Sequence, residues 1–175
     1  MKTVGILGGT MEFLDRLHQI LSQAQLKDME FLIGQTAAQL QQDRKLDLLA
    51  VYPGTRVATK EQLPSCHLLL LPGSEAVCVQ QCEASCAMSY GTSSKDSLTV
   101  SSMEDQHIAL AVQRELVTLT GGTVDRQELI LSVRDGSHPM PLLFWAGLLL
   151  VLGSSPDELP ALIEEKLISK IKPGI

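Results

Sequence analysis

The chain has 175 residues, of which 45% are hydrophobic, enough for the core of one ordinary domain but scarcely of two. We therefore predict a single domain over residues 1–175, with an antiparallel subregion at about 97–134. Its formal net charge of -6, with scattered lysines and arginines, argues against a nucleic-acid-binding surface.

Apolar runs alternate with helical patterns through the first half of the chain. The runs occupy residues 3–7, 29–33, 46–52 and 68–71, and each is followed by glycine or proline. Helical spacing of apolar residues follows the first run at 13–21, and Thr36 can cap a short helix after the second. Near-continuous apolar runs are typical of parallel strands with both faces buried. These patterns predict an α/β fold, with a mainly parallel sheet flanked by helices.

The pattern changes after Gly91 to an alternation of apolar and polar residues. It covers residues 98–102, 108–119 and 124–133, with Gly121 and Gly122 as a turn between the last two. We predict an antiparallel meander in this C-terminal half. In a hairpin about that turn, Arg114 and Glu115 would lie close to Gln127 and Glu128.

Two helices are predicted after the meander. The apolar residues 142–152 are predicted to form a buried helix, because they are about half as long as the roughly 20 residues that a membrane span needs. Ser155 and Glu158 have the spacing of a capping box that would begin a final amphipathic helix. The N-terminus lacks the pattern of a signal peptide, so we expect a cytoplasmic protein with no membrane partner.

A glycine turn follows the first apolar run and has the outline of a phosphate-binding loop. Such a loop ends in Gly-Lys-Ser/Thr, because its backbone N–H groups and lysine hold the phosphates and its hydroxyl ligates Mg²⁺. Here Gly8, Gly9 and Thr10 are followed by Met11, Glu12 and Phe13. A carboxylate at Glu12 would oppose a polyphosphate, so we expect a tight strand-to-helix turn and no nucleotide cofactor.

The order of these elements resembles the central domain of the Mur ligases, the ATP-dependent enzymes that join amino acids to peptidoglycan precursors. The segments that carry the resemblance are the strand, glycine turn and helix at 5–21, the strand with Pro-Gly at 68–77, the Tyr-Gly strand end at 87–100, and Gly-Ser-His-Pro at 136–139 with the helices after it. The resemblance implies a P-loop-like fold over nearly the whole chain. It also connects the protein with bacterial cell-wall metabolism.

The chain departs from this family at the residues that would bind Mg-ATP. In the loop, Glu12 stands in place of the lysine and Phe13 in place of the hydroxyl residue. Tyr52-Pro53 stands where a glutamate that ligates Mg²⁺ is expected. Further along, Pro72-Gly73-Ser74 replaces an acidic motif, and Pro139 replaces an asparagine. Phosphoryl transfer depends on the positioning and charge neutralisation that such residues supply. We therefore expect no metal and no catalytic residues, and a module that binds a small ligand or a partner protein in the bacterial cytoplasm.

Polar residues in the second half supply the candidate binding surface. We expect a ligand at the segment from Ser89 to Ser102, which is rich in serine and threonine, with a contribution from the glycine turn. The candidate residues are Gly8, Gly9, Thr10, Tyr90, Ser93, Ser94, Lys95, Arg114 and His138.

Two alternatives remain open from the sequence. One is a small cysteine-dependent enzyme, racemase-like or hydrolase-like, that uses Cys66, Cys78 or His138. The first nine residues resemble the start of aspartate and glutamate racemases, but the sequence motifs that surround the two catalytic cysteines of those enzymes are absent here. Because residues 86–90 are predicted as a strand, Cys86 should leave the helical line of Cys78 and Cys82, and buried free thiols are expected. The other alternative is a homo-oligomer that associates through an exposed edge at 108–119.

Overall fold

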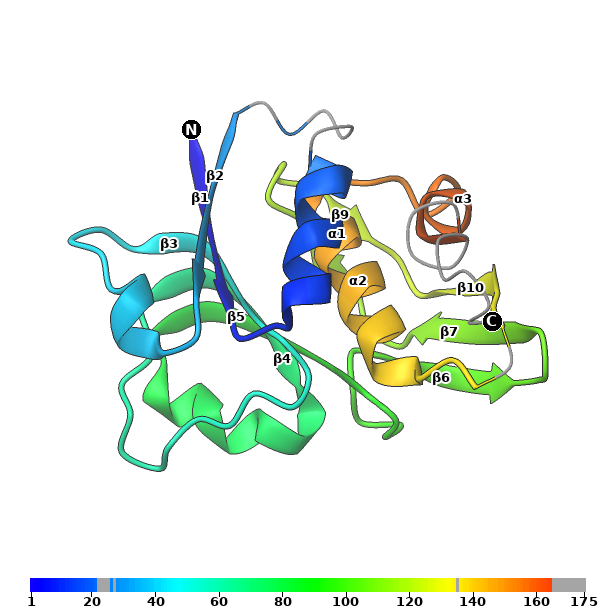
Figure 1. Ribbon diagram of the computed structural model, residues 1–175, viewed down its shortest axis with the longest axis horizontal. Helices are drawn as coiled ribbons and strands as arrows, with labels where there is room; N and C mark the ends of the chain where they lie inside the picture. The colour runs from blue at the N-terminus through cyan, green and yellow to red at the C-terminus, as the bar shows by residue number, and fades with distance from the viewer. Residues whose placement is uncertain (22–25, 27, 135, 165–175) are drawn as a thin grey trace.

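The computed structural model describes residues 1–21, 26, 28–134 and 136–164. This part of the chain contains an eight-stranded sheet in the order β10-β7-β6-β5-β4-β3-β1-β2 (Figure 1). Its strands are β1 (Lys2–Leu7), β2 (Met29–Gly34), β3 (Leu46–Val51), β4 (Cys66–Pro72), β5 (Ala84–Gly91), β6 (Leu98–Met103), β7 (His107–Val112) and β10 (Gln127–Ser132). Strands β1 to β6 are parallel to one another, whereas β7 runs antiparallel to both β6 and β10. The predicted α/β class, with a mainly parallel sheet and an antiparallel C-terminal part, is confirmed.

Both faces of the central parallel strands β1, β3 and β4 are buried, which explains their continuous apolar runs. Leu48 and Ala50 of β3 face a core formed with the helices α1 (Met11–Leu21), α2 (Pro139–Leu152) and α3 (Leu159–Ile163). The alternate residues Leu49 and Val51 face a second core. The second core contains residues of the 3-10 helices η1 (Ala37–Leu40) and η2 (Gly73–Gln81). Figure 1 shows α1 and α2 side by side, with η1 and η2 away from them. Helical cover is therefore sparser than the prediction of a helix-flanked sheet implied.

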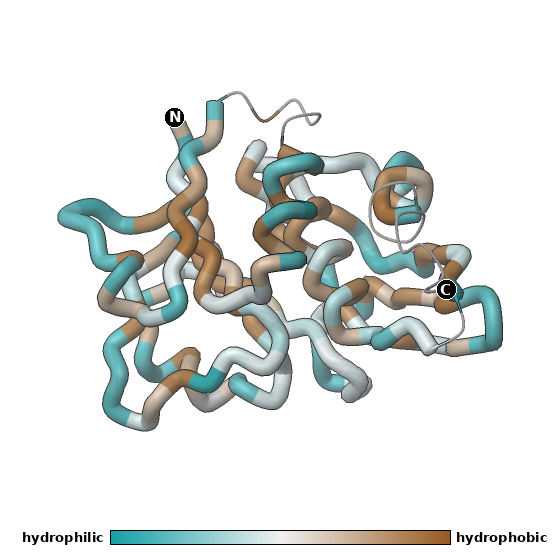
Figure 2. Tube along the Cα trace, viewed as in Figure 1, coloured by the Kyte–Doolittle hydropathy of each residue, from teal (hydrophilic) through white to brown (hydrophobic). Residues whose placement is uncertain are grey.

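Helix α2 is apolar around its whole circumference because the protein surrounds it. All of its residues from Leu142 to Leu152 are buried, and Figure 2 shows brown hydrophobic residues recurring along the helix with paler ones between them. The Nδ1 atom of His138 accepts a hydrogen bond from the Met140 amide at the helix start, and Gly153 ends the helix at φ 108°. The predicted buried helix is confirmed.

Among the described helices, none combines the length and apolarity that crossing a membrane requires.

A short parallel seam between β5 and β6 joins the first five strands to the part of the sheet formed by β6, β7 and β10. Only Tyr90 with Leu98 and Gly91 with Thr99 are paired there. Helix α2 packs across the seam at Gly147, where an added Cβ would lie 3.3 Å from Leu70 of β4 and 3.5 Å from Leu98 of β6. The absence of a side chain at Gly147 lets the helix approach both strands closely.

The prediction of one continuous strand over residues 108–119 is wrong, because strand β7 ends at Val112. The amide of Gln113 donates to the carbonyl of Ser97, and a separate pair, β8 (Leu116–Val117) with β9 (Thr123–Val124), forms around the glycine turn. Arg114 and Glu115 lie in the break and do not face residues 127 and 128, which pair with Val112 and Ala111 of β7. Strand β7 is paired on both sides, so the sheet edges are β10 and β2, not residues 108–119.

Of two predicted helix starts, one is confirmed and one is wrong. Thr36 is the N-cap of η1, as predicted, although this helix is a single 3-10 turn. Helix α3 begins at Leu159 with Glu158 as its N-cap. The Ser155 hydroxyl accepts from the Asp157 amide, and the Ser155 carbonyl accepts from the Glu158 and Leu159 amides, so the predicted capping box is wrong. The predicted continuation of this helix after residue 164 lies outside the described residues.

Candidate functional site

The carboxyl ends of β3, β4 and β5 open side by side onto a cavity of about 850 Å³. It is lined by residues 52–54 after β3, 72–74 and 76 after β4, 89, 91–93, 95 and 96 around the end of β5, and 138, 140 and 141 at the start of α2. We call it the carboxyl-edge cavity. In parallel sheets ligands bind at this edge, and the volume lies in the range of small-molecule sites.

One wall of the cavity is the loop between β5 and β6, which its own hydrogen bonds hold in place. The amides of Ser89 and Ser97 each donate to the other residue's hydroxyl at 3.3 Å. Within the loop, the Asp96 amide donates to the Ser93 carbonyl, and the Lys95 amide to the Ser93 hydroxyl. The hydroxyl-rich composition of this segment therefore serves the loop's own structure as well as the cavity.

The carboxylate of Asp96 is buried in the same loop, with 5% of the residue exposed. It lies against the backbone of Gly73 and Gly91, where an added Cβ would come within 1.9 Å and 2.5 Å of its oxygens. Its Oδ2 atom accepts a hydrogen bond from the Ser93 amide at 3.1 Å. Two glycines from neighbouring strand ends thus leave room for one carboxylate at the cavity wall.

Tyr52 separates the carboxyl-edge cavity from a smaller hollow of about 240 Å³ beside α1 and α2. Its ring is half-buried and packs 4.5 Å from Phe13 and 5.2 Å from Phe144, measured between ring centroids. Burial raises the pKa of the Tyr52 hydroxyl, and the nearby Glu12 carboxylate raises it further. The hydroxyl is therefore a neutral donor or acceptor near pH 7.

The glycine turn is packed as a strand-to-helix connection. Gly8 and Gly9 have φ of 87° and 107°, which glycine adopts readily. The Gly8 amide donates to the Gly34 carbonyl at 2.8 Å, and the Thr10 hydroxyl accepts from the Phe13 amide at 3.2 Å. These two N–H groups are used within the chain and do not point at an anion.

The predicted site residues fall into separate places. Ser93, Lys95 and His138 come together at the carboxyl-edge cavity. Gly8, Gly9 and Thr10 line another hollow of about 340 Å³, which also touches residues 52–54.

The other three candidates do not line the carboxyl-edge cavity. Tyr90 lies fully inside the core, and its hydroxyl donates to the Val51 carbonyl at 2.6 Å. Ser94 is exposed in the loop, and Arg114 is exposed in the break after β7.

Sequence reasoning missed Asp96, the most buried charged residue of the described chain. The available signal was an acidic residue immediately before an apolar strand, three residues after Ser93. Because Asp96 becomes buried only when Gly73 and Gly91 meet it from two different strand ends, the local sequence carries little of this information.

The cysteines are buried thiols, as predicted, apart from the half-buried Cys86 on β5. The Sγ atoms of Cys66 and Cys82 lie 3.5 Å apart, and the hydrogen bond to Cys82, together with burial, raises the pKa of Cys66. Burial and Glu75 raise the pKa of Cys78. A raised pKa leaves little thiolate near pH 7, which is unfavourable for a nucleophile. Within the described residues, no cluster of three or more metal-binding side chains occurs.

Comparisons of this chain with protein-family models, curated proteins and solved structures found no match.

Proposed function

We propose that this chain is a non-catalytic binding protein that holds a small molecule in the carboxyl-edge cavity. The observation that carries the proposal is a cavity of about 850 Å³ at the ends of three parallel strands. One of its walls is a loop fixed by reciprocal serine hydrogen bonds, so the site is formed before a ligand arrives. A preformed site of this kind reduces the entropy lost on binding.

The glycine turn supports a function other than ATP-dependent ligation. Its Gly8 amide is used by Gly34, and Glu12 forms an ion pair with Arg16 one helical turn away. A triphosphate at the start of α1 would therefore meet a carboxylate and would lack the amide of Gly8. The resemblance to the Mur ligases supports a role in the bacterial cytoplasm connected with cell-wall metabolism, as binding without ligation.

The raised pKa values of Cys66 and Cys78 favour this proposal over an enzyme that uses either of these cysteines. Cys66 and Cys78 are both buried and lie outside the lining of the carboxyl-edge cavity. His138 does line the cavity, but its Nδ1 atom accepts the Met140 amide as a helix cap. The thiols of Cys66 and Cys78 therefore do not share a site with the imidazole of His138.

The test is an NMR titration of labelled protein with glucose, N-acetylglucosamine, glucosamine, butylamine, butanol and butyrate at millimolar concentration, alongside Mg-ATP. We expect at least one of the six small molecules to shift the amide resonances of Gly91 and Ser93, and Mg-ATP to shift none at the glycine turn. Ala76→Trp, which fills the cavity from η2, should abolish the shifts. The matched variant Ala38→Trp places the same side chain on the exposed face of η1 and should leave them unchanged.

Absence of cavity shifts with all six molecules would reject the proposed small-molecule site. Magnesium-dependent binding of ATP at the glycine turn would reject the loss of nucleotide binding.

A further inference from the structure

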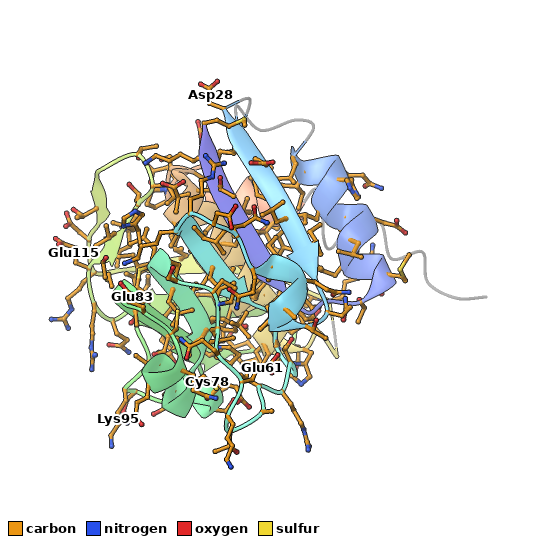
Figure 3. The ribbon with its side chains drawn as sticks, turned by 90° about the vertical axis from the view of Figure 1, so that its left-hand side faces the viewer. Asp28, Glu61, Cys78, Glu83, Lys95 and Glu115 are labelled. Carbon is orange, nitrogen blue, oxygen red and sulfur yellow. The ribbon has the colours of Figure 1, made fainter. Side chains whose placement is uncertain are left out.

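The Asp96 carboxylate is only partly satisfied by the protein. Its Oδ2 atom accepts the Ser93 amide, but no described residue donates a hydrogen bond to Oδ1. No lysine, arginine or histidine of the described chain forms an ion pair with it. The adjacent Lys95 side chain is exposed and extends away from the body of the protein (Figure 3). A carboxylate that is 5% exposed is thus left without a counter-charge at the wall of a cavity.

Burial of an ionised carboxylate is unfavourable unless hydrogen bonds and an opposite charge replace the lost water. At Asp96 the protein supplies one hydrogen bond, to Oδ2, and no opposite charge, although the neighbouring backbone leaves space for the carboxylate. Side chains at Gly73 or Gly91 would overlap its oxygens, so glycine at both positions keeps the place open. Oδ1 is not fully enclosed, since Thr99 Oγ1 is the only fully buried, unpaired side-chain polar atom of the described residues. A ligand that displaces water from Oδ1 would meet both requirements by donating a hydrogen bond and bringing positive charge.

We infer that the carboxyl-edge cavity binds the protonated amine of its ligand, with Asp96 Oδ1 as the acceptor. This rests on the proposed function and names the ligand class for the same cavity. An ammonium group supplies both the hydrogen bond and the counter-charge, whereas an alcohol supplies only the hydrogen bond. The hydroxyls of Ser74 and Thr92 also line the cavity and can accept the remaining ammonium protons. The other titratable side chains at the cavity are Tyr52, Lys95 and His138.

The experiment compares amines with neutral molecules of matched size on the full chain. The probes are butylamine against butanol, and glucosamine against N-acetylglucosamine, in which acetylation removes the charge. Dissociation constants come from the amide shifts of Gly73, Gly91 and Ser93 at pH 7. We expect each amine to bind at least about tenfold more tightly than its neutral counterpart, the size expected for a charge-assisted hydrogen bond.

Asp96→Asn tests the acceptor directly, because asparagine is nearly the same size and its side-chain oxygen can still accept the Ser93 amide. It should remove the amine preference. The matched variant Asp28→Asn changes an exposed carboxylate at the other end of the molecule and should retain it (Figure 3). Since the comparison of amines with neutral molecules uses the unmodified protein, it remains decisive even if Asp96→Asn unfolds.

Equal binding of amines and neutral molecules would overturn the amine assignment while leaving the proposed binding function intact. An amine preference that survives in folded Asp96→Asn would overturn the role of Asp96. Binding of neither class would reject both the amine assignment and the proposed function.

Discussion

The hydroxyl of Tyr90 offers a sharp test of the core beneath the cavity. It donates to the Val51 carbonyl at 2.6 Å, and the residue is completely buried. Tyr90→Phe keeps the ring and its edge-on contact with Phe144, whose centroid is 5.8 Å away, but removes the donor. Leaving a buried acceptor unpaired costs about 1–3 kcal/mol. For a chain of this length, we expect the melting temperature to fall by roughly 2–12 °C.

The same substitution should change the response of the protein to alkaline pH. Burial raises the pKa of Tyr90 above its ordinary value, with a smaller contribution from Tyr52. Above about pH 10 the unfolded chain releases the phenolic proton while the folded chain keeps it, so the contribution of this proton to stability is lost as pH rises. The loss amounts to about 1.4 kcal/mol for each pH unit above 10 in the wild-type protein and is absent from the Phe variant.

Urea unfolding at pH 7 and pH 11 measures both effects. The stability difference between the wild type and Tyr90→Phe should be largest at pH 7 and should narrow at pH 11. Tyr52 titrates in both proteins and therefore does not contribute to the change. A Phe variant as stable as the wild type at pH 7, or a stability difference of the same size at both pH values, would refute the reasoning.

The remaining predictions concern the glycine turn, the cysteine thiols and the packing of Gly91 against the Asp96 carboxylate. Adding millimolar Mg-ATP to the Glu12→Lys variant should not raise its melting temperature, because the Gly8 amide still donates to the Gly34 carbonyl and is not free for a phosphate. Alkylation followed by mass spectrometry should label the half-buried Cys86 before the fully buried Cys66, whose pKa is raised. Gly91→Ala should destabilise the fold by about 1–3 kcal/mol in thermal unfolding, because the added methyl overlaps a buried carboxylate.

Each of these predictions has an outcome that would contradict it. A shift of several degrees with Mg-ATP in Glu12→Lys would show that the turn still cradles phosphate. Fastest labelling at Cys66 would revive the cysteine-enzyme alternative. Gly122→Ala, where the nearest atom to the new methyl is 3.5 Å away, should be far less destabilising than Gly91→Ala, and equal effects would contradict the packing of Asp96.

The parallel strands could be predicted from the sequence because burial on both faces leaves a continuous apolar run. Strands β1 to β4 all have this signature, and the glycines and prolines that end them also mark the edge where the cavity forms. The break after Val112 coincides with three consecutive polar residues at 113–115, but polarity alone does not distinguish the end of a strand from a polar cross-strand pair within it. A long-range hydrogen bond to the Ser97 carbonyl redirects the chain there.

The candidate site was predictable only in part for the same reason. Ser93, Lys95 and His138 could be selected as polar residues near glycine, and they do line one cavity. Tyr90 was selected on the same grounds, but its position in β5 turns it into the core. The burial of Asp96 depends on residues about 5 and 23 positions earlier in the chain, and local patterns cannot reveal such packing.

The short seam between β5 and β6 has a mechanical consequence. With two residue pairs joining them, the two parts of the sheet depend on α2 for their continuity, since this helix packs against strands on both sides. The carboxyl-edge cavity lies at that junction, between the β5–β6 loop and the first turn of α2. A bulky residue at Gly147 would therefore press against Leu70 and Leu98, neither of which lines the cavity, and would still alter the binding site by separating the two parts of the sheet.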